Sequence, residues 1–557
     1  MTRAFIRSLS LRVFAIGSIL STYSGCDWEK VEGELSRATP VLEDLEKREV
    51  PLLHATMAST AFSIAEAKWR HLPVPSADGP QLWPVTMAAV IRSEPGPEAE
   101  KIGYLRVGER VGRSLEPVEY QGCPGGWYAI RPLGFICKDK RITLREEHPI
   151  VEAFQYPPDR ARPMPYHYAF LRSIAPNYLR VPSKNEQFKT EMRLERHLRN
   201  YKKLHKKWDF FKEGANRVPL DQYGAASAGP TPTEELPPYE KRFGGEPGRG
   251  IPSWLVGERR IPNFSTVREF KIGDLFVGRV KRHAGVALVD AFQSGEEAQE
   301  RIFALATDGR LIPADKLKID EASPFHGIRL KGTQLSLPLG FAYRNKTGIY
   351  ELKGDRLLRT AYAERRSVID LENEERVFNG NRYIRSKDNH WYRVSDLRLA
   401  SRKKSFPWFA QRSTKWIDLS IMEQVLVLYE GEVPVYITLV STGRDWMGDP
   451  AKTLSTPTGT FRITRKHVTT TMDSSVADSE FELRDVPWVM YFKGGYALHA
   501  AYWHNDFGRP RSHGCVNLSP IDARYVFAWA TPQVPNHWHG AYSGKAMGQG
   551  TLVHIHR

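Results

Sequence analysis

Short strand-like runs cover most of this chain and constrain its fold more than any other feature. They stand between Gly and Pro residues in 84–144, again in 264–400, and from Thr414 towards the C-terminus. Runs of about four to eight residues bounded by turn residues are typical of strands. With 557 residues, the sequence therefore predicts a multidomain, mainly β protein of about three to five domains.

The composition is that of folded domains, with 41% hydrophobic and 26% charged residues. Eighty Lys and Arg residues against 64 Asp and Glu residues give a formal net charge of +16. This excess is compatible with an anionic partner such as phospholipid headgroups, wall polymers or nucleic acid, and equally with scattered surface charge.

The first 26 residues are predicted to be a targeting segment. Arg3, Arg7 and Arg12 accompany a short apolar core, 13–20, that is too short for a normal membrane span. The segment ends in Ser24-Gly25-Cys26 and resembles a bacterial lipoprotein processing site. That resemblance implies a lipid on Cys26 and a membrane-anchored, periplasm-facing location in the cell envelope; secretion with an incidental cysteine is the alternative. Residues 27–83 are predicted to be a tether.

Residues 84–144 resemble bacterial SH3-like domains, through short runs such as Gly126-Trp127-Tyr128 and Gly134-Phe135-Ile136. Such a domain would either bind wall peptides or glycan, or act as a spacer. Cys123 and Cys137 lie fourteen residues apart and could form a disulfide in an oxidising compartment. The four cysteines include no CxxC pair and the histidines have no zinc-ligand spacing, so no metal site is predicted.

Residues 145–262 are predicted to hold one basic helix, 184–213, followed by a Pro- and Gly-rich linker. Ser183 and Glu186 form a capping box at the helix start. Lysines cover the other faces, so the helix either docks on a neighbouring domain, which we favour, or lies on a membrane or nucleic acid. Apolar residues recur mostly at three- and four-residue steps: Phe188, Met192, Leu194, Leu198, Tyr201, Leu204, Trp208 and Phe211.

Residues 264–400 are predicted to contain one or two further SH3-like modules. The segments 311–319 and 391–399 end alike, in Ala-Asp-Lys-Leu-Lys-Ile and Ser-Asp-Leu-Arg-Leu. Such internal similarity is typical of repeated modules.

The chemistry of the chain is concentrated near its C-terminus, where one thiol follows two histidines. Cys515 lies sixteen residues after His499 and two after His513. A thiolate is the nucleophile, and an imidazole within hydrogen-bond reach can take the thiol proton. Gly514 has no side chain, so backbone N–H groups around it could approach a developing oxyanion.

At these residues the chain, over about 414–557, resembles the L,D-transpeptidase catalytic domain family of bacterial cell-wall enzymes. The resemblance rests on a histidine, a fixed spacing and Ser-His-Gly-Cys, with Thr456-Pro457-Thr458-Gly459 as a second matching element. It implies a compact, mostly β domain. It also implies roles for the following residues: Cys515 as nucleophile, His499 as general base, the Ala500 carbonyl as the group that orients the imidazole, amides of His513, Gly514 and Cys515 as the oxyanion hole, and Ser512 and His513 as residues that shape the site.

The resemblance further implies a peptidoglycan L,D-transpeptidase that forms 3→3 cross-links between stem peptides through a cysteine acyl-enzyme, or attaches a partner to the wall. It implies no cofactor and no nucleic-acid partner. Two alternatives stay open: an L,D-carboxypeptidase with the same Cys and His, or a non-catalytic wall-binding lipoprotein. His504 is the rival base, although we interpret Trp503, His504 and Asn517 as residues that line the cleft and bind substrate.

Overall fold

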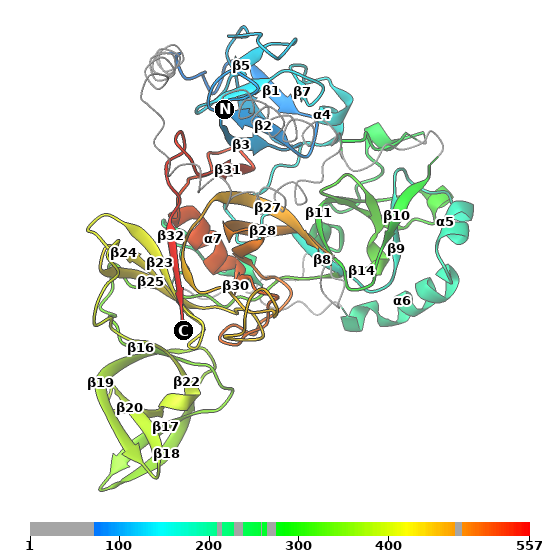
Figure 1. Ribbon diagram of the computed structural model, residues 1–557. Coiled ribbons are helices and arrows are strands. Elements are labelled where there is room, and N and C mark those ends of the chain that lie inside the picture. The colour runs from blue at the N-terminus through cyan, green and yellow to red at the C-terminus, as the bar shows by residue number, and fades with distance from the viewer. Residues whose placement is uncertain (1–71, 209–213, 228–237, 258, 265–273, 474–481) are drawn as a thin grey trace, which may run out of the picture. The chain divides into compact units, whose positions relative to one another are not determined.

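The computed structural model describes residues 72–208, 214–227, 238–257, 259–264, 274–473 and 482–557 (Figure 1). The targeting segment, the lipid-attachment prediction at Cys26 and most of the predicted tether lie outside these residues. Val74–Arg557 forms one compact unit. Strands dominate it, which confirms the predicted mainly β class. Among the described residues, no helix has both the length and the apolar character needed to cross a membrane.

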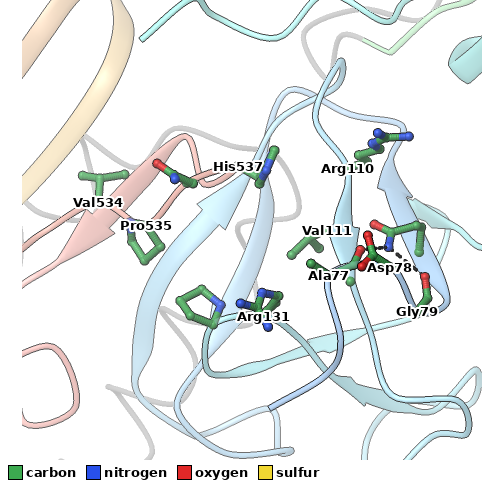
Figure 2. A pocket seen from close by; sticks show the side chains of 13 residues that line it. Ala77, Asp78, Gly79, Arg110, Val111, Arg131, Val534, Pro535 and His537 are labelled. Carbon is green, nitrogen blue, oxygen red and sulfur yellow. Dashed lines mark hydrogen bonds between the residues drawn. The ribbon is translucent and has the colours of Figure 1, made fainter. Parts of the chain in front are cut away.

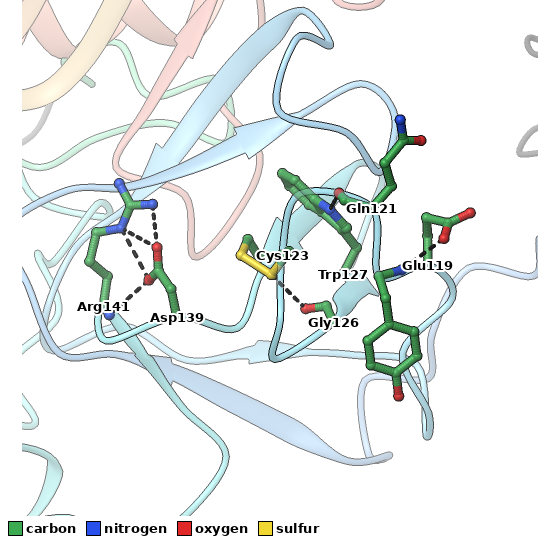
Figure 3. Close-up of a disulfide and its surroundings, with 9 residues drawn as sticks. Glu119, Gln121, Cys123, Gly126, Trp127, Asp139 and Arg141 are labelled. Carbon is green, nitrogen blue, oxygen red and sulfur yellow. Dashed lines mark hydrogen bonds and ion pairs between the residues drawn. A yellow bond between two sulfur atoms is a disulfide. The ribbon is translucent and has the colours of Figure 1, made fainter. Parts of the chain in front are cut away.

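The N-terminal module, residues 81–143, is built from seven short strands. β1 pairs with β4 and β7, whereas β2 lies between β3 and β6. A disulfide joins Cys123 to Cys137, with the Cα atoms 5.8 Å apart, beside the Trp127 indole (Figure 3). The strands are β1 (Gln81–Pro84), β2 (Ala89–Arg92), β3 (Lys101–Leu105), β4 (Val111–Gly112), β5 (Trp127–Ala129), β6 (Phe135–Cys137) and β7 (Ile142–Thr143).

The second module begins ahead of the predicted helix, in a part of 145–262 for which no strand was predicted. Its strands β8 (His167–Leu171) and β9 (Ala175–Tyr178) pair with β11 (Gly285–Gln293) and β10 (Phe276–Val280). Sequence missed these strands because their partners lie about a hundred residues away. The sheet is completed by β12 (Ile302–Ala306), β13 (Leu311–Pro313) and β14 (Leu317–Ile319), while α4 (Pro149–Ala153) precedes it.

The predicted single helix over 184–213 is two helices, α5 (Lys184–Thr190) and α6 (Leu194–Trp208). The predicted capping box at Ser183 and Glu186 is present. The break follows Glu191, whose carboxylate is fully buried and paired with Arg301 and Lys316. Arg193 then adopts a left-handed φ of 55°, which few residues other than glycine tolerate. Residues 209–213 lie outside the described part of the chain.

The span 264–400, predicted to contain one or two SH3-like modules, contributes to three sheets, because the short strand β15 (Ile328–Arg329) joins a sheet of the C-terminal domain. Its first part belongs to the second module, and 339–400 forms a seven-stranded sheet of its own, the third module. The two similar segments share a strand, a short 3₁₀ helix and a strand: β13, Ala314–Lys316 and β14, then β21, Val394–Asp396 and β22. The third module's strands are β16 (Leu339–Ala342), β17 (Thr347–Lys353), β18 (Arg356–Ala363), β19 (Val368–Phe378), β20 (Asn381–Ser386), β21 (Trp391–Arg393) and β22 (Leu397–Ala400).

The C-terminal domain holds the strands expected from its alternating sequence. One sheet has the order β15 (Ile328–Arg329), β25 (Val433–Leu439), β24 (Val425–Glu430), β23 (Lys415–Ser420), β32 (Leu552–His556) and β26 (Gly459–Arg462). The other is built on β27 (Arg465–Asp473), β28 (Glu482–Lys493), β29 (Tyr496–Ala500), β30 (Val516–Leu518) and β31 (Gly540–Tyr542). Helix α7 (Pro520–Trp529) begins at the predicted Ser519 cap.

Two strand pairings join this domain to the modules before it. β31 pairs with β3 of the N-terminal module, and β28 meets β11 of the second module at Leu483 and Gly285. Buried side chains of the N-terminal module, such as Ile91 and Ile102, share one hydrophobic core with Val468 and Trp538 of the C-terminal domain. The modules therefore pack as parts of one molecule within Val74–Arg557.

Candidate active site

Two parallel strands bring the predicted nucleophile and base to one face of a sheet. In the β29–β30 pair, Leu498 is opposite Val516 and His499 is opposite Asn517. Cys515, one residue before β30, is therefore next to Ala497, whose backbone N–H donates to the Cys515 sulfur. Because alternate residues of a strand share a face, Ala497 and His499 lie on the same side. Cys515 and His499 are thus diagonal neighbours on one face.

The His499 imidazole is held in one tautomer by the backbone. Its Nδ1 lies 3.0 Å from the Ala500 carbonyl oxygen, so Nδ1 carries the hydrogen and Nε2 is the basic atom. The ring is 3% exposed and lies 5.7 Å, centroid to centroid, from the Trp503 ring. This burial lowers the pKa of His499 to about 4. The predicted role of the Ala500 carbonyl matches this geometry.

The Cys515 side chain is half-buried, and its sulfur contacts a backbone carbonyl. Its Sγ donates to the Gly495 carbonyl oxygen at 3.7 Å, at the turn between β28 and β29. Burial raises the pKa of Cys515 to about 11. These surroundings favour the neutral thiol and the neutral imidazole over the thiolate–imidazolium pair that the motif predicts. Within the described residues no hydrogen bond joins the two side chains.

Ser512 closes the loop that carries the nucleophile. Its hydroxyl donates to the Cys515 carbonyl oxygen and accepts from the Gly514 amide at 3.0 Å. The Gly514 amide is therefore occupied in this state and does not serve the predicted oxyanion hole. The Cys515 amide makes no hydrogen bond that the described residues reveal, so it is the better candidate donor for an oxyanion.

Gly514 is required for both its backbone and its space. Its φ is 125°, and a Cβ added there would lie 2.6 Å from the Tyr496 ring. Thr456 fixes the same residue from the other side, because its hydroxyl donates to the Gly514 carbonyl at 2.8 Å and accepts from the Gly443 amide at 2.9 Å. The Thr-Pro-x-Gly element thus positions the cysteine loop, a role that its sequence alone did not indicate.

The three residues predicted to contact substrate differ in what they can do. Asn517 is 1% exposed, and its side-chain amide lies 3.0 Å from Nε2 of His504, so it holds the loop and is closed to substrate. His504 also accepts from the Asp506 amide through Nδ1 at 3.2 Å. With both ring nitrogens engaged in hydrogen bonds, His504 is a poor rival base, although its pKa, lowered to about 4 by burial and by Arg511, equals that of His499. Trp503 is half-buried beside His499.

His513 flanks the nucleophile and is half-buried. Its pKa is lowered by burial and by the nearby Arg444 guanidinium. Arg444 comes within reach because its amide donates to the Ser512 carbonyl at 3.0 Å.

The segment between base and nucleophile is held by the third module, a contact that no sequence signal reveals. The Arg366 guanidinium donates at 2.5 Å to the side-chain oxygen of Asn505 and also to its carbonyl oxygen. Arg398 donates to the Gly508 carbonyl at 2.8 Å. Arg365 also pairs with Asp506 at 3.4 Å, so three arginines of 339–400 restrain the loop 501–512 that carries Trp503 and His504.

A cavity of about 780 Å³ lies elsewhere, where the N-terminal module meets the loop 534–537 (Figure 2). Arg110, Arg131 and His537 line it, and none of its lining residues belongs to the Cys515 segment. Among the described residues, no group of three or more His, Cys, Asp or Glu side chains is placed to hold a metal ion.

Comparison with known proteins shows what the C-terminal domain is similar to. Residues 414–555 match the family model of the L,D-transpeptidase catalytic domain. A curated Bacillus subtilis protein, provisionally named L,D-transpeptidase YciB, is 26% identical over 148 residues, which are 22% of this chain and 62% of that protein. The chain thus spans less than two thirds of that relative. The family resemblance is confirmed for this domain, whereas the SH3-like resemblance upstream stays a prediction.

Two solved structures are each similar to a part of the chain. An L,D-transpeptidase from Xylanimonas cellulosilytica is 22% identical, with 28% of this chain and 64% of that chain covered and a TM-score of 0.19. The catalytic domain of an Enterococcus faecium L,D-transpeptidase is 20% identical, with 26% and 98% covered and a TM-score of 0.20.

Proposed function

We propose that this chain, whose residues 414–555 match the L,D-transpeptidase catalytic domain, is a peptidoglycan L,D-transpeptidase with Cys515 as nucleophile and His499 as general base. The observation that carries the proposal is the diagonal placement of these two residues on the β29–β30 pair, with the imidazole fixed by the Ala500 carbonyl. The expected partner is the peptidoglycan stem peptide.

The first half-reaction makes a thioester. Nε2 of His499 takes the thiol proton as the sulfur attacks the carbonyl that follows the third residue of a tetrapeptide stem. Because their surroundings favour the neutral forms of both groups, we expect this proton to move when substrate is bound. The Cys515 amide stabilises the oxyanion. The C–N bond then breaks, and the imidazolium returns its proton to the leaving D-alanine amine.

The second half-reaction regenerates the enzyme. The side-chain amine of a neighbouring stem's diamino acid attacks the thioester carbonyl, and Nε2 accepts the amine proton. Collapse of the oxyanion expels the thiolate, which is reprotonated by the imidazolium, and leaves a 3→3 cross-link. Splitting the amide exchange into two acyl transfers is the advantage of covalent catalysis.

Product analysis tests this function. Purified full-length protein is incubated with tetrapeptide muropeptides, and the products are separated by mass. Cross-linked dimers support the transpeptidase, whereas tripeptide monomers alone support the L,D-carboxypeptidase alternative. Cys515→Ala must abolish both products. If wild-type protein gives neither product but still binds purified wall, the chain is a non-catalytic wall-binding protein.

The envelope location is a separate proposal. It rests on residues 1–26, where the segment before Cys26 resembles a lipoprotein processing site. Mass analysis of the mature N-terminus from cells tests it: a lipid-modified Cys26 supports membrane anchoring, and an unmodified downstream N-terminus contradicts it.

A further inference from the structure

The junction of α5 and α6 (Figure 1) carries exposed side chains that form a surface outside the catalytic domain. We call it the basic corner. It consists of six cationic and two apolar side chains, all exposed: Lys184, Phe188, Lys189, Met192, Arg193, Arg196, Arg199 and Lys203.

Helix α6 separates a docked face from a charged face. Leu194 is buried, and Leu198 and Tyr201 are half-buried. At 100° per residue, Arg196, Arg199 and Lys203 lie on the opposite side of the helix. The helix therefore packs against the rest of the molecule, as predicted, but only along one face. The other side carries three cations within two turns.

The corner also exposes apolar side chains beside these cations. Met192 is 85% exposed and Phe188 is 38% exposed. Both belonged to the apolar stripe that was expected to dock, and the break after Glu191 turns them outward instead. Exposed apolar residues next to lysine and arginine are typical of surfaces that lie in the interface of a membrane.

A buried polar network holds the corner in this conformation. Glu191 is fully buried and pairs with Arg301 at 2.8 Å and Lys316 at 3.0 Å. Gln187 is fully buried as well and donates to the Pro182 and Ala298 carbonyl oxygens, each at 3.0 Å. Burying charges costs free energy of desolvation, so such networks are better explained by a need for a defined geometry than by stability.

We propose that the basic corner docks on an anionic phospholipid surface. The cations face the headgroup phosphates, and Phe188 and Met192 enter the boundary between headgroups and acyl chains. The apolar pair favours lipid over a soluble polyanion, because a phosphate polymer offers no apolar layer to receive it. This surface is separate from the cysteine site, so the membrane proposal can be wrong while the proposed function is right, and the reverse.

Vesicle binding by the full-length chain tests the proposal. Partition is measured on vesicles of phosphatidylglycerol with phosphatidylcholine and on phosphatidylcholine alone, at two salt concentrations. Each cation near an anionic leaflet strengthens binding about fivefold. In R196Q/R199Q/K203Q, the ratio of affinities for anionic and neutral vesicles should therefore fall about 100-fold. In F188S/M192S, the affinity for anionic vesicles should fall about tenfold.

A matched variant, R356Q/K404Q/R412Q, removes three exposed cations elsewhere and should bind like the wild type. All variants change exposed side chains, so unchanged thermal unfolding verifies their fold. If the matched variant lost as much affinity for anionic vesicles, the binding would depend only on net charge, and the proposal would be overturned. An unaltered affinity of F188S/M192S, with equally tight binding to inorganic polyphosphate, would also overturn it in favour of a soluble polyanion.

Discussion

At the scale of single residues, the surroundings of Cys515 and His499 favour the neutral forms of both side chains. Burial raises the pKa of Cys515 to about 11 and lowers that of His499 to about 4. Both shifts favour the neutral forms, because a low-dielectric environment penalises charge. The thiolate is therefore expected to form only when a bound carbonyl is ready to receive it.

This resting state predicts a particular pH dependence of thiol reactivity. Below its pKa, the thiolate fraction of Cys515 rises tenfold per pH unit, so alkylation by iodoacetamide should accelerate about tenfold per unit from pH 6 to pH 9. The rate of alkylation at Cys515 is measured by quenching the reaction at successive times and mapping the modified peptides. A rate that is constant over this range would reveal a preformed thiolate–imidazolium pair instead.

Thr456 is expected to affect acylation only by holding the cysteine loop in place. Thr456→Val keeps the shape but removes the hydroxyl that bridges the Gly443 amide and the Gly514 carbonyl. Leaving these groups unpaired costs about 1–3 kcal/mol, and displacement of the cysteine loop should slow acylation about 100-fold. The exposed neighbour Thr458 provides the control, since Thr458→Val should acylate like the wild type. Equal rates in the two variants would refute this role.

At the scale of elements, the sequence predicted local structure well and long-range partners poorly. The strands β23–β25, β28 and β29 and the start of α7 follow from alternation and capping near the motif. The helix break at Glu191 does not, because Arg301 and Lys316 lie more than a hundred residues away. The closed position of Asn517 was missed for the same reason, since it depends on how the loop folds back over His504.

The contact between Arg366 and Asn505 makes the third module a positioning element for the base. In Arg366→Ala, the loop 501–512 loses this restraint, and Trp503 should shield His499 less. Greater hydration raises the pKa of a buried histidine, so the acid limb of the pH–rate profile should move upward from about pH 4. Acylation should also slow about tenfold.

Two further variants separate positioning from general damage to the module. Arg366→Lys keeps the charge without the two-pronged geometry of the guanidinium and should recover only part of the rate. Arg382, paired with Glu375 on the surface of the same module, provides the matched control, so Arg382→Ala should leave the profile unchanged. An acid limb that stays in place in Arg366→Ala would contradict the positioning role.

At the scale of the whole molecule, one buried carboxylate ties three parts of the chain together. Asp485 of β28 pairs with Arg106 of the N-terminal module, both nearly inaccessible to solvent. It also accepts from Thr307 of the second module and from Thr469 of β27. The Arg106 guanidinium holds the pKa of Asp485 well below its usual range, against the opposing effect of burial. The modules are therefore expected to unfold together.

A double-mutant cycle tests this coupling. Arg106→Leu or Asp485→Leu alone leaves a buried charge unpaired and should cost about 3–5 kcal/mol. The double variant removes both charges and should be less destabilised than the sum of the two singles. Thermal unfolding followed separately in the N-terminal module and at Cys515 gives both values. Additive losses, or unfolding of one part without the other, would contradict the coupling.

The most direct test of the central claim is the identity and rate of the covalent adduct at the active site. Full-length protein is treated with a carbapenem, which mimics the acyl donor, and the adduct is measured by intact mass and located by peptide mapping. We predict one adduct, on Cys515, that is absent in Cys515→Ala. It should form about 100- to 10,000-fold more slowly in His499→Ala and at nearly the normal rate in His504→Gln. An adduct on another residue, or a normal rate in His499→Ala with loss in His504→Gln, would contradict the account.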